Sequence, residues 1–228
     1  MYSGADQTGA ATSVNDQLGE HADELIAQLR AMRKPKLFVI SGPSGVGKDT
    51  VIEVLRERLP EAYFAVTATT RPRRPGEIDG VHYYFMTAEA FTERLAEGEF
   101  LESAVVYGNH YGVPKSPIRA ALMRGQDAFV KVDVQGSESI RNLAPKATLI
   151  FLAPESMGSL LQRLRHRKTE DPDVLLQRFN TASRELNSAL KFDYVVFNES
   201  DRVERAVEDI ISIVDAERFR LTDDEVIL

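Results

Sequence analysis

The segment from Gly42 to Lys48 places glycines and a lysine in the pattern G-x-x-x-x-G-K. It follows the apolar run Leu37–Ile40, typical of a buried strand, and precedes a segment with helical periodicity. In this context the glycines let backbone N–H groups turn inward around phosphate oxygens, while the helix N-terminus and the lysine add positive charge. The pattern predicts a site for the phosphates of a nucleoside triphosphate, formed by Gly42, Pro43, Ser44, Gly45, Val46, Gly47 and Lys48.

Asp49 follows the lysine at a position where this pattern usually has a hydroxyl, and Thr50 comes next. A carboxylate in the first turn of a helix interacts favourably with the helix dipole. Two arrangements are open for Asp49. Its side chain points to solvent, which we favour, or it accepts a hydrogen bond from a magnesium-bound water.

The charge of the chain restricts its partners. The formal net charge of −7 over 228 residues argues against general attraction to nucleic acid or to an anionic membrane. Anion binding must then come from local basic clusters, and two candidates are RPRR (Arg71–Arg74) and RLRHRK (Arg163–Lys168). The alternative is that each cluster is only a solvated face.

The composition excludes several kinds of site. Without cysteine, the chain has no disulfide, no thiolate nucleophile and no cysteine-ligated zinc, and its four histidines are scattered. No apolar run approaches the roughly 20 residues that cross a bilayer, and the N-terminus has no apolar signal core. We therefore expect a cytoplasmic protein.

Strand-like and helix-like segments alternate from Lys36 onward, which predicts an α/β fold with a parallel sheet and helices on both faces. The expected strands are Lys36–Ile40, Ala62–Thr67, Asp127–Val134, Thr148–Leu152 and Tyr194–Asn198. The expected helices are Asp16–Arg33, Lys48–Arg58, Thr87–Gly98, Pro117–Arg124, Ser137–Leu143, Glu155–Arg165, Pro172–Leu190 and Arg202–Phe219. The interval Thr67–Ser116 departs from the alternation and is interpreted as an inserted sub-domain.

Several motifs after the loop carry a specific resemblance: TATTRPRRPGE (67–77), DGVHYYF (79–85), FLE (100–102), YGNHYGVP (107–114) and VDVQG (132–136). With them the chain resembles the guanylate kinases, from about Leu37 to Glu217. The resemblance implies a P-loop kinase with a parallel sheet core flanked by helices, an inserted GMP-binding sub-domain and a helical lid. The expected divisions are an N-terminal extension (1–34, disordered and then helical), a kinase-like domain (35–220, GMP-binding region about 67–116, lid about 158–186) and a tail (221–228).

The resemblance also implies roles for individual residues. The phosphate of GMP would be held by Arg71, Arg74, Tyr83 and Tyr111, and the guanine would face Thr67, Glu102 and Asp133. Guanidinium forks and phenol hydroxyls suit a dianionic phosphate monoester, which supports the first set independently. On the ATP side, the resemblance assigns Thr50 to the phosphates, Asn198 to the adenine, and Lys48, Arg163, Arg167 and Arg178 to catalysis.

Two positions depart from the family pattern. Val113 stands where the family usually has a Ser or Thr that contacts guanine, and Lys131 stands where an acidic residue often precedes Asp133. Neither change removes the expected phosphate clamp. Both bear on how selectively the base is read.

The expected reaction is the ATP-dependent phosphorylation of GMP, and of dGMP, with Mg²⁺ held by phosphates and water and with Thr50 as a candidate ligand. We expect a monomer or homodimer with no nucleic-acid or membrane partner. A non-catalytic interaction module would have no physical need for Lys48 and the lid arginines. A kinase of another phosphorylated acceptor fits Glu102 and Asp133 less well, because two carboxylates suit the donor-rich edge of guanine.

Overall fold

A parallel sheet forms the centre of the molecule in the computed structural model, which describes residues 21–29, 34–106, 108–166 and 172–220. Its strand order is β2-β7-β1-β8-β9. The strands are β1 (Leu37–Ser41), β2 (Tyr63–Phe64), β7 (Ala128–Lys131), β8 (Thr148–Pro154) and β9 (Tyr194–Asn198). The register aligns Val39 with Val130 on one side and with Leu149 on the other. The expected α/β architecture is confirmed.

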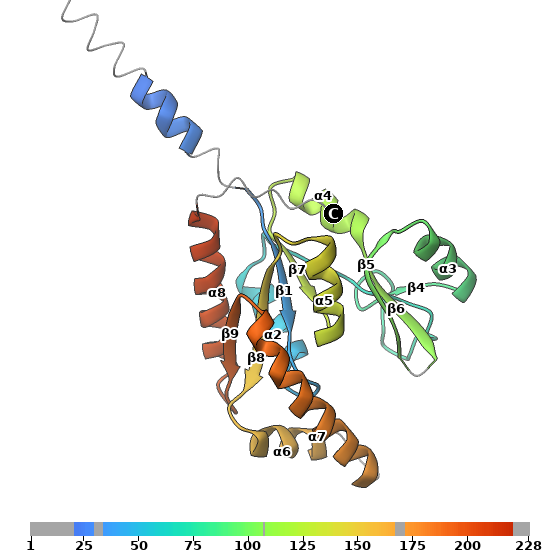
Figure 1. Ribbon diagram of the computed structural model, residues 1–228. Helices are drawn as coiled ribbons and strands as arrows, with labels where there is room; N and C mark the ends of the chain where they lie inside the picture. The colour runs from blue at the N-terminus through green and yellow to red at the C-terminus, as the bar shows by residue number, and fades with distance from the viewer. Residues whose placement is uncertain (1–20, 30–33, 107, 167–171, 221–228) are drawn as a thin grey trace, which may run out of the picture.

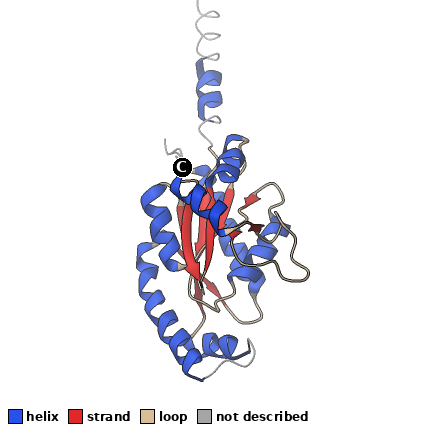
Figure 2. Cartoon of the chain, turned by 90° about the vertical axis from the view of Figure 1, so that its right-hand side faces the viewer, coloured by secondary structure: helices blue, strands red, loops and turns tan. Residues whose placement is uncertain are grey.

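Helices cover both faces of this sheet (Figure 2) because its central strand is apolar on both sides. Phe38 and Ile40 pack with α2 (Lys48–Arg58) and α8 (Val203–Phe219). Leu37 and Val39 pack on the opposite face, against α4 (Lys115–Met123) and α5 (Val134–Leu143). The phosphate loop leaves the carboxyl end of β1, where open α/β sheets bind their ligands.

A second, four-stranded sheet lies beside the core in Figure 1, with the order β4-β3-β6-β5. Its elements are β3 (Ala68–Thr69), β4 (Tyr84–Phe85), α3 (Ala88–Ala96), β5 (Phe100–Val106) and β6 (Asn109–Pro114). Stacked rings of Phe91 and Phe100 join α3 to this sheet. The sequence predicted an insertion and its helix, but it predicted none of the strands β3, β4, β5 and β6.

The expected strand 62–67 is interrupted in the structure. The backbone N–H of Ala65 still bonds to Phe129 of the core sheet, whereas the carbonyl of Thr67 accepts from Tyr84 of the second sheet. The chain therefore passes from one sheet to the other within three residues. Similarly, the expected strand 127–134 ends at Lys131, because the Asp133 side chain caps α5 by accepting from Gly136 N (2.7 Å).

Two paired helices, α6 (Met157–His166) and α7 (Pro172–Leu186), extend from the lower end of the core in Figure 1. Leu160 and Leu164 of α6 pack with Ala182 of α7. The helix expected to continue to Leu190 ends at Leu186 and is followed by the 3₁₀ helix η1 (Asn187–Lys191). This pair corresponds to the segment expected to form a lid.

Residues 21–29 form a helix that projects from the body in both overall views. Its apolar residues Leu25, Ile26 and Leu29 are about half exposed, at 46%, 47% and 51%. Most of the N-terminal extension and the tail 221–228 fall outside the described residues. None of the described helices is both long enough and apolar enough to cross a membrane.

Candidate active site

The phosphate loop requires glycine at both of its ends. A Cβ atom at Gly42, whose φ is 144°, would lie 2.2 Å from the carbonyl oxygen of Leu152. At Gly47, with φ 98°, a Cβ atom would lie 2.6 Å from Asn198 Nδ2. The loop therefore fits closely against β8 and β9, and its close approach and backbone conformation both exclude larger residues.

Lys48 opens α2, and its ammonium folds back onto the loop. Nζ donates to the carbonyl oxygens of Gly42 (2.5 Å) and Pro43 (3.2 Å). Burial lowers the pKa of Lys48 to about 8, and the nearby carboxylates of Glu185, Asp49 and Asp133 oppose part of that shift. Because the surroundings are acidic, the ammonium is retained at neutral pH in the place where phosphates would meet it.

Asp49 forms an ion pair with Lys131, at the end of β7. The sequence left open a solvent-facing carboxylate or one that holds a metal-bound water. The structure gives a third arrangement, in which the carboxylate contacts a lysine 82 positions away in the chain. Both partners depart from the usual patterns: Asp49 stands where the phosphate-loop pattern has a hydroxyl, and Lys131 stands where the family often has an acidic residue.

A pocket lies beside the loop on the side of α6 and β9. Asn198 is buried there and donates from Nδ2 to the carbonyl of Val46 (2.7 Å). The guanidinium of Arg163 donates to the carbonyls of Val46 and Asn198, at 3.0 Å each. The lining of the pocket consists of Gly47, Thr50, Ser159, Gln162, Arg163, Asn198, Glu199, Ser200, Asp201 and Val203. Thr50, Arg163 and Asn198, predicted from scattered positions, are thus brought together.

In the inserted sub-domain, Arg71 forms a two-pronged ion pair with Glu77 (2.7 and 3.1 Å). The guanidinium also lies over the Tyr83 ring, 5.4 Å from its centroid, and Tyr83 contacts Tyr111 edge to face. The pairing with Arg71 lowers the pKa of Glu77 to about 2. Three of the four predicted phosphate-clamp residues therefore lie together, with a carboxylate holding the arginine in place.

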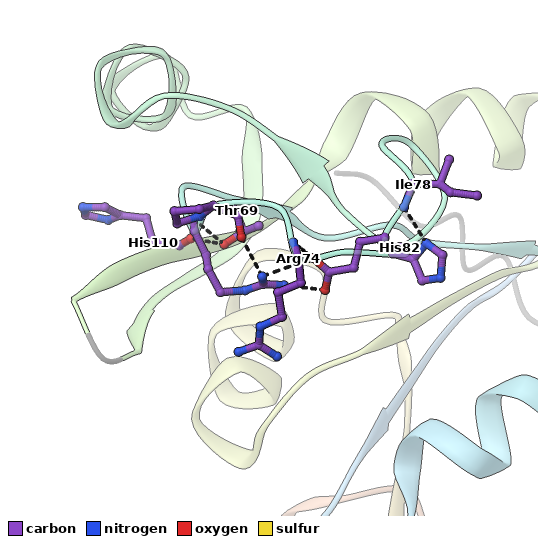
Figure 3. A network of polar contacts seen from close by, with 8 residues as sticks. Thr69, Arg74, Ile78, His82 and His110 are labelled. Carbon is purple, nitrogen blue, oxygen red and sulfur yellow. Dashed lines mark hydrogen bonds and ion pairs between the residues drawn. The ribbon is translucent and has the colours of Figure 1, made fainter.

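Backbone contacts fix the loop that carries this clamp (Figure 3). Thr69 Oγ1 donates to the carbonyl of His110 and accepts from the backbone N–H of Arg71. Glu77 also accepts from the backbone N–H of Arg74, and the Arg74 side chain is exposed. The charge of Arg74 also helps to lower the pKa of Glu77.

Glu102 and Asp133 come from β5 and the N-terminus of α5 and approach one another. A Cβ atom at Gly136 would lie 2.9 Å from Glu102 Cγ, so the glutamate packs directly on the first turn of α5. Burial, and secondarily the charge of Asp133, raise the pKa of Glu102 to about 7. Two carboxylates held in this way favour a ligand that presents hydrogen-bond donors. Val113, only 2% exposed, pairs with Glu102 across β5 and β6.

One cavity is lined both by core residues and by some of the residues predicted to bind GMP. Among the predicted residues it contains Thr67, Tyr83 and Tyr111, whereas Arg71, Arg74, Glu102 and Asp133 lie outside it. The complete lining is Ile52, Arg56, Phe64, Ala65, Val66, Thr67, Val81, His82, Tyr83, Tyr111, Val113, Phe129, Val130 and Lys131. The described residues contain no group of three or more His, Cys, Asp or Glu side chains placed to hold a metal.

The family model described as guanylate kinase matches residues 34–217. The chain belongs to the guanylate kinase family. Guanylate kinase 2, chloroplastic/mitochondrial, of Oryza sativa subsp. japonica is 47% identical over 189 residues, 82% of this chain and 66% of that protein. Guanylate kinase of Carboxydothermus hydrogenoformans is 41% identical over 189 residues, 83% of this chain and 92% of that one. The crystal structure of guanylate kinase from Anaplasma phagocytophilum is 30% identical, with a TM-score of 0.66 over 82% of this chain and 88% of that one.

The three arginines that were expected in a lid are only partly described. Arg163 contacts the phosphate loop as given above, Arg167 lies outside the described residues, and Arg178 belongs to α7 with a side chain outside them. Leu164 of α6 nevertheless packs closely on the loop at Gly45. A Cβ atom added to this glycine would lie only 2.7 Å from Leu164 Cδ2. Helix α6 and the phosphate loop are thus in direct contact.

Sequence reasoning missed two carboxylates of this guanylate kinase site. Glu185 of α7 accepts from the backbone N–H of Ser44 (3.3 Å), and Glu77 holds Arg71. Glu77 is included in the TATTRPRRPGE motif, so its six-residue spacing from Arg71 was available as a signal. Glu185 stands 141 positions from Ser44, and no local pattern connects the two.

Proposed function

We propose that this chain transfers the terminal phosphoryl group of ATP to GMP, and to dGMP, giving ADP and GDP. What supports the proposal most is that one chain presents a phosphate loop together with an arginine held beside two tyrosines and a pair of neighbouring carboxylates, groups that suit the phosphates of ATP and the two ends of GMP. Membership of the guanylate kinase family supports the same substrate pair.

In this proposal the protein contributes position and charge. A phosphate oxygen of GMP attacks the terminal phosphorus of ATP while the bond to ADP breaks, and this transfer needs no general base from the protein. Lys48 would leave the carbonyls of Gly42 and Pro43 for the phosphates of ATP. Arg163 would likewise turn from its backbone partners, joined by Arg167 and Arg178. These charges would stabilise the transferring group.

The proposed acceptor residues form two groups, one that binds the phosphate of GMP and one that binds the guanine. Arg71, with its orientation fixed by Glu77, would bind the phosphate together with Arg74, Tyr83 and Tyr111. Glu102 would accept from guanine N1–H and from the N2 amino group, with Asp133 and Thr67 near the same base. Adenine presents an unprotonated N1 to this carboxylate, so AMP would leave the glutamate unpaired.

Mg²⁺ is the proposed cofactor, and when bound it would neutralise phosphate charge. Thr50, exposed in the first turn of α2, offers a hydroxyl on the side of the loop where ATP would lie, and the remaining ligands would be phosphates and water. We further propose a cytoplasmic monomer or homodimer without nucleic-acid or membrane partners, consistent with a net charge of −7.

A coupled assay of ADP release against GMP, dGMP, AMP, CMP and UMP tests the proposal. We expect turnover with GMP and dGMP to exceed turnover with the others by at least about a hundredfold, as expected where a site hydrogen-bonds the base. The variant Lys48→Ala should lose at least about 3 kcal/mol of transition-state stabilisation, a hundredfold or more in rate, while retaining GMP binding by calorimetry. Equal turnover of AMP, or an active Lys48→Ala enzyme, would reject the assignment.

A further inference from the structure

Lys131 lies between the two parts of the site. Its side chain lines the cavity that contains Thr67, Tyr83 and Tyr111. Its ammonium pairs with Asp49, in the turn of α2 that immediately follows Lys48. A single lysine thus extends from the acceptor region to the phosphate loop.

The pair is not explained by a contribution to stability. Both side chains are accessible, at 38% for Lys131 and 59% for Asp49, and an ion pair of this kind stabilises a fold by about 0–1 kcal/mol. The Lys131 charge also contributes to the lowered pKa of Lys48, so the two ammonium groups are close enough to interact. Placing two cations together costs energy in the empty site and is favourable when phosphates lie between them.

We propose that Lys131 binds the phosphate of the acceptor nucleotide and that Asp49 holds the lysine in place when the acceptor is absent. The proposal rests on the proposed function, because it assumes an acceptor with a phosphate monoester. The acceptor phosphate and the terminal phosphate of the donor repel one another as they approach. A cation at the boundary between their sites reduces that repulsion, and an accessible ammonium can exchange a carboxylate for a phosphate oxygen without rearranging the backbone.

Substitutions of the two members of the pair should then shift the Kd for GMP in opposite directions. In Lys131→Gln the Kd for GMP, measured by calorimetry without ATP, should rise about tenfold or more, because a charge-assisted contact is lost. In Asp49→Asn the Kd should fall about two- to threefold, because the lysine no longer has a competing carboxylate. Lys131→Arg should retain most of the affinity. A purely structural pair would instead change the melting temperature in both variants and would not produce opposite shifts in Kd.

Lys191→Gln is the matched control. Lys191 is also an accessible lysine in an ion pair, with Glu138 (2.6 Å), and it lines neither the acceptor cavity nor the phosphate loop. It should leave the Kd for GMP unchanged. The inference is overturned if Lys131→Gln binds GMP as tightly as the native protein, or if both pair variants shift the Kd in the same direction. If the native chain phosphorylates GMP in the same series, the proposed function stands even when this inference fails.

Discussion

At the scale of single residues, the site contains two groups, Glu102 and Lys48, whose pKa values are shifted mainly by burial. Glu102 is a partly buried carboxyl close to a second carboxylate, and its pKa of about 7 follows from burial first and from Asp133 second. Lys48 is shifted downward to about 8 by its own burial. Both groups therefore titrate close to neutral pH, unlike most carboxyls and lysines.

The kcat/KM for GMP should depend on the ionisation of Glu102. Only ionised Glu102 can accept both guanine donors, and its protonated fraction increases as pH falls through about 7. We expect kcat/KM for GMP to decline below pH 7, approaching tenfold per pH unit for a single ionisation. Initial rates measured from pH 6 to 8.5 at saturating ATP provide the test. Because the GMP phosphate itself ionises near pH 6, the Glu102→Gln variant is the necessary control.

In Glu102→Gln the pH dependence that comes from Glu102, with its pKa of about 7, should disappear, leaving only that of the GMP phosphate near pH 6. At pH 8 the kcat/KM for GMP should fall by about tenfold or more, or 1.4 kcal/mol, and the preference for GMP over AMP should narrow. It should also stabilise the unliganded protein at pH 8. The folded pKa is raised above 4.5, so the ionised group opposes folding above that value, and removing its charge should contribute about 1 kcal/mol after solvent screening. A dependence still centred at about pH 7, or an unchanged preference for GMP over AMP, would show that another group recognises the base.

At the scale of elements, α7 contacts the phosphate loop through Glu185. Its Glu185 carboxylate accepts from Ser44 N–H, a donor of the kind that such loops present to phosphates. Burial raises the pKa of Glu185, and the hydrogen bond from Ser44 and the charge of Lys48 reduce that increase. ATP would therefore compete with the Glu185 carboxylate of α7 for the backbone N–H of the loop.

Glu185→Gln should consequently bind ATP more tightly. A neutral amide competes less strongly for the loop N–H and does not repel the triphosphate, so we expect the Kd for ATP to fall about threefold to tenfold at pH 7. Loss of the Glu185 charge also lowers the pKa of Lys48 further, and the phosphates of bound ATP would oppose that change. Fluorescent-nucleotide titration would measure the effect, with Glu138→Gln on α5 as an exposed control. Weaker ATP binding in Glu185→Gln would indicate that the carboxylate supports the loop instead.

At the scale of the whole molecule, a buried carboxylate links the C-terminal helix to the start of the central sheet. Asp127, 7% exposed, accepts from the backbone N–H of Lys36 (2.8 Å) and from Nε of Arg218 (2.7 Å). These contacts connect the segment before β1, the segment before β7 and the end of α8. The link lies at the amino-terminal end of the strands, away from the nucleotide site.

Asp127→Ala should lower the free energy of unfolding by about 2–3 kcal/mol, because it leaves a backbone donor and an arginine without this partner. Asp215→Ala, which removes an exposed contact with the same Arg218, should cost less than about 0.5 kcal/mol. Urea titration followed by circular dichroism would compare the two. Similar values for the two variants would mean that water replaces the buried carboxylate at little cost.

Local sequence determined the parts of the site that are continuous along the chain. Apolar residues at β1 predicted a strand buried on both faces, and the glycines and lysine that follow predicted the turn into α2, because these choices follow from backbone sterics and periodicity. The motif of residues 67–77 likewise placed Arg71 and Arg74 on one loop. The short strands β3 and β4, of two residues each, gave no periodic signal.

Tertiary structure alone decided which distant charges meet. Asp49 and Lys131 are 82 positions apart, and Ser44 and Glu185 are 141 apart, so neither contact follows from local spacing. The proximity of Glu102 to Asp133 arises because β5 packs on the first turn of α5. A pKa depends on burial and on charges within a few ångströms, and both are set by how elements pack. The sequence therefore determined which chemical groups are available, and the packing of the two sheets and of helices α6 and α7 decided which of them interact.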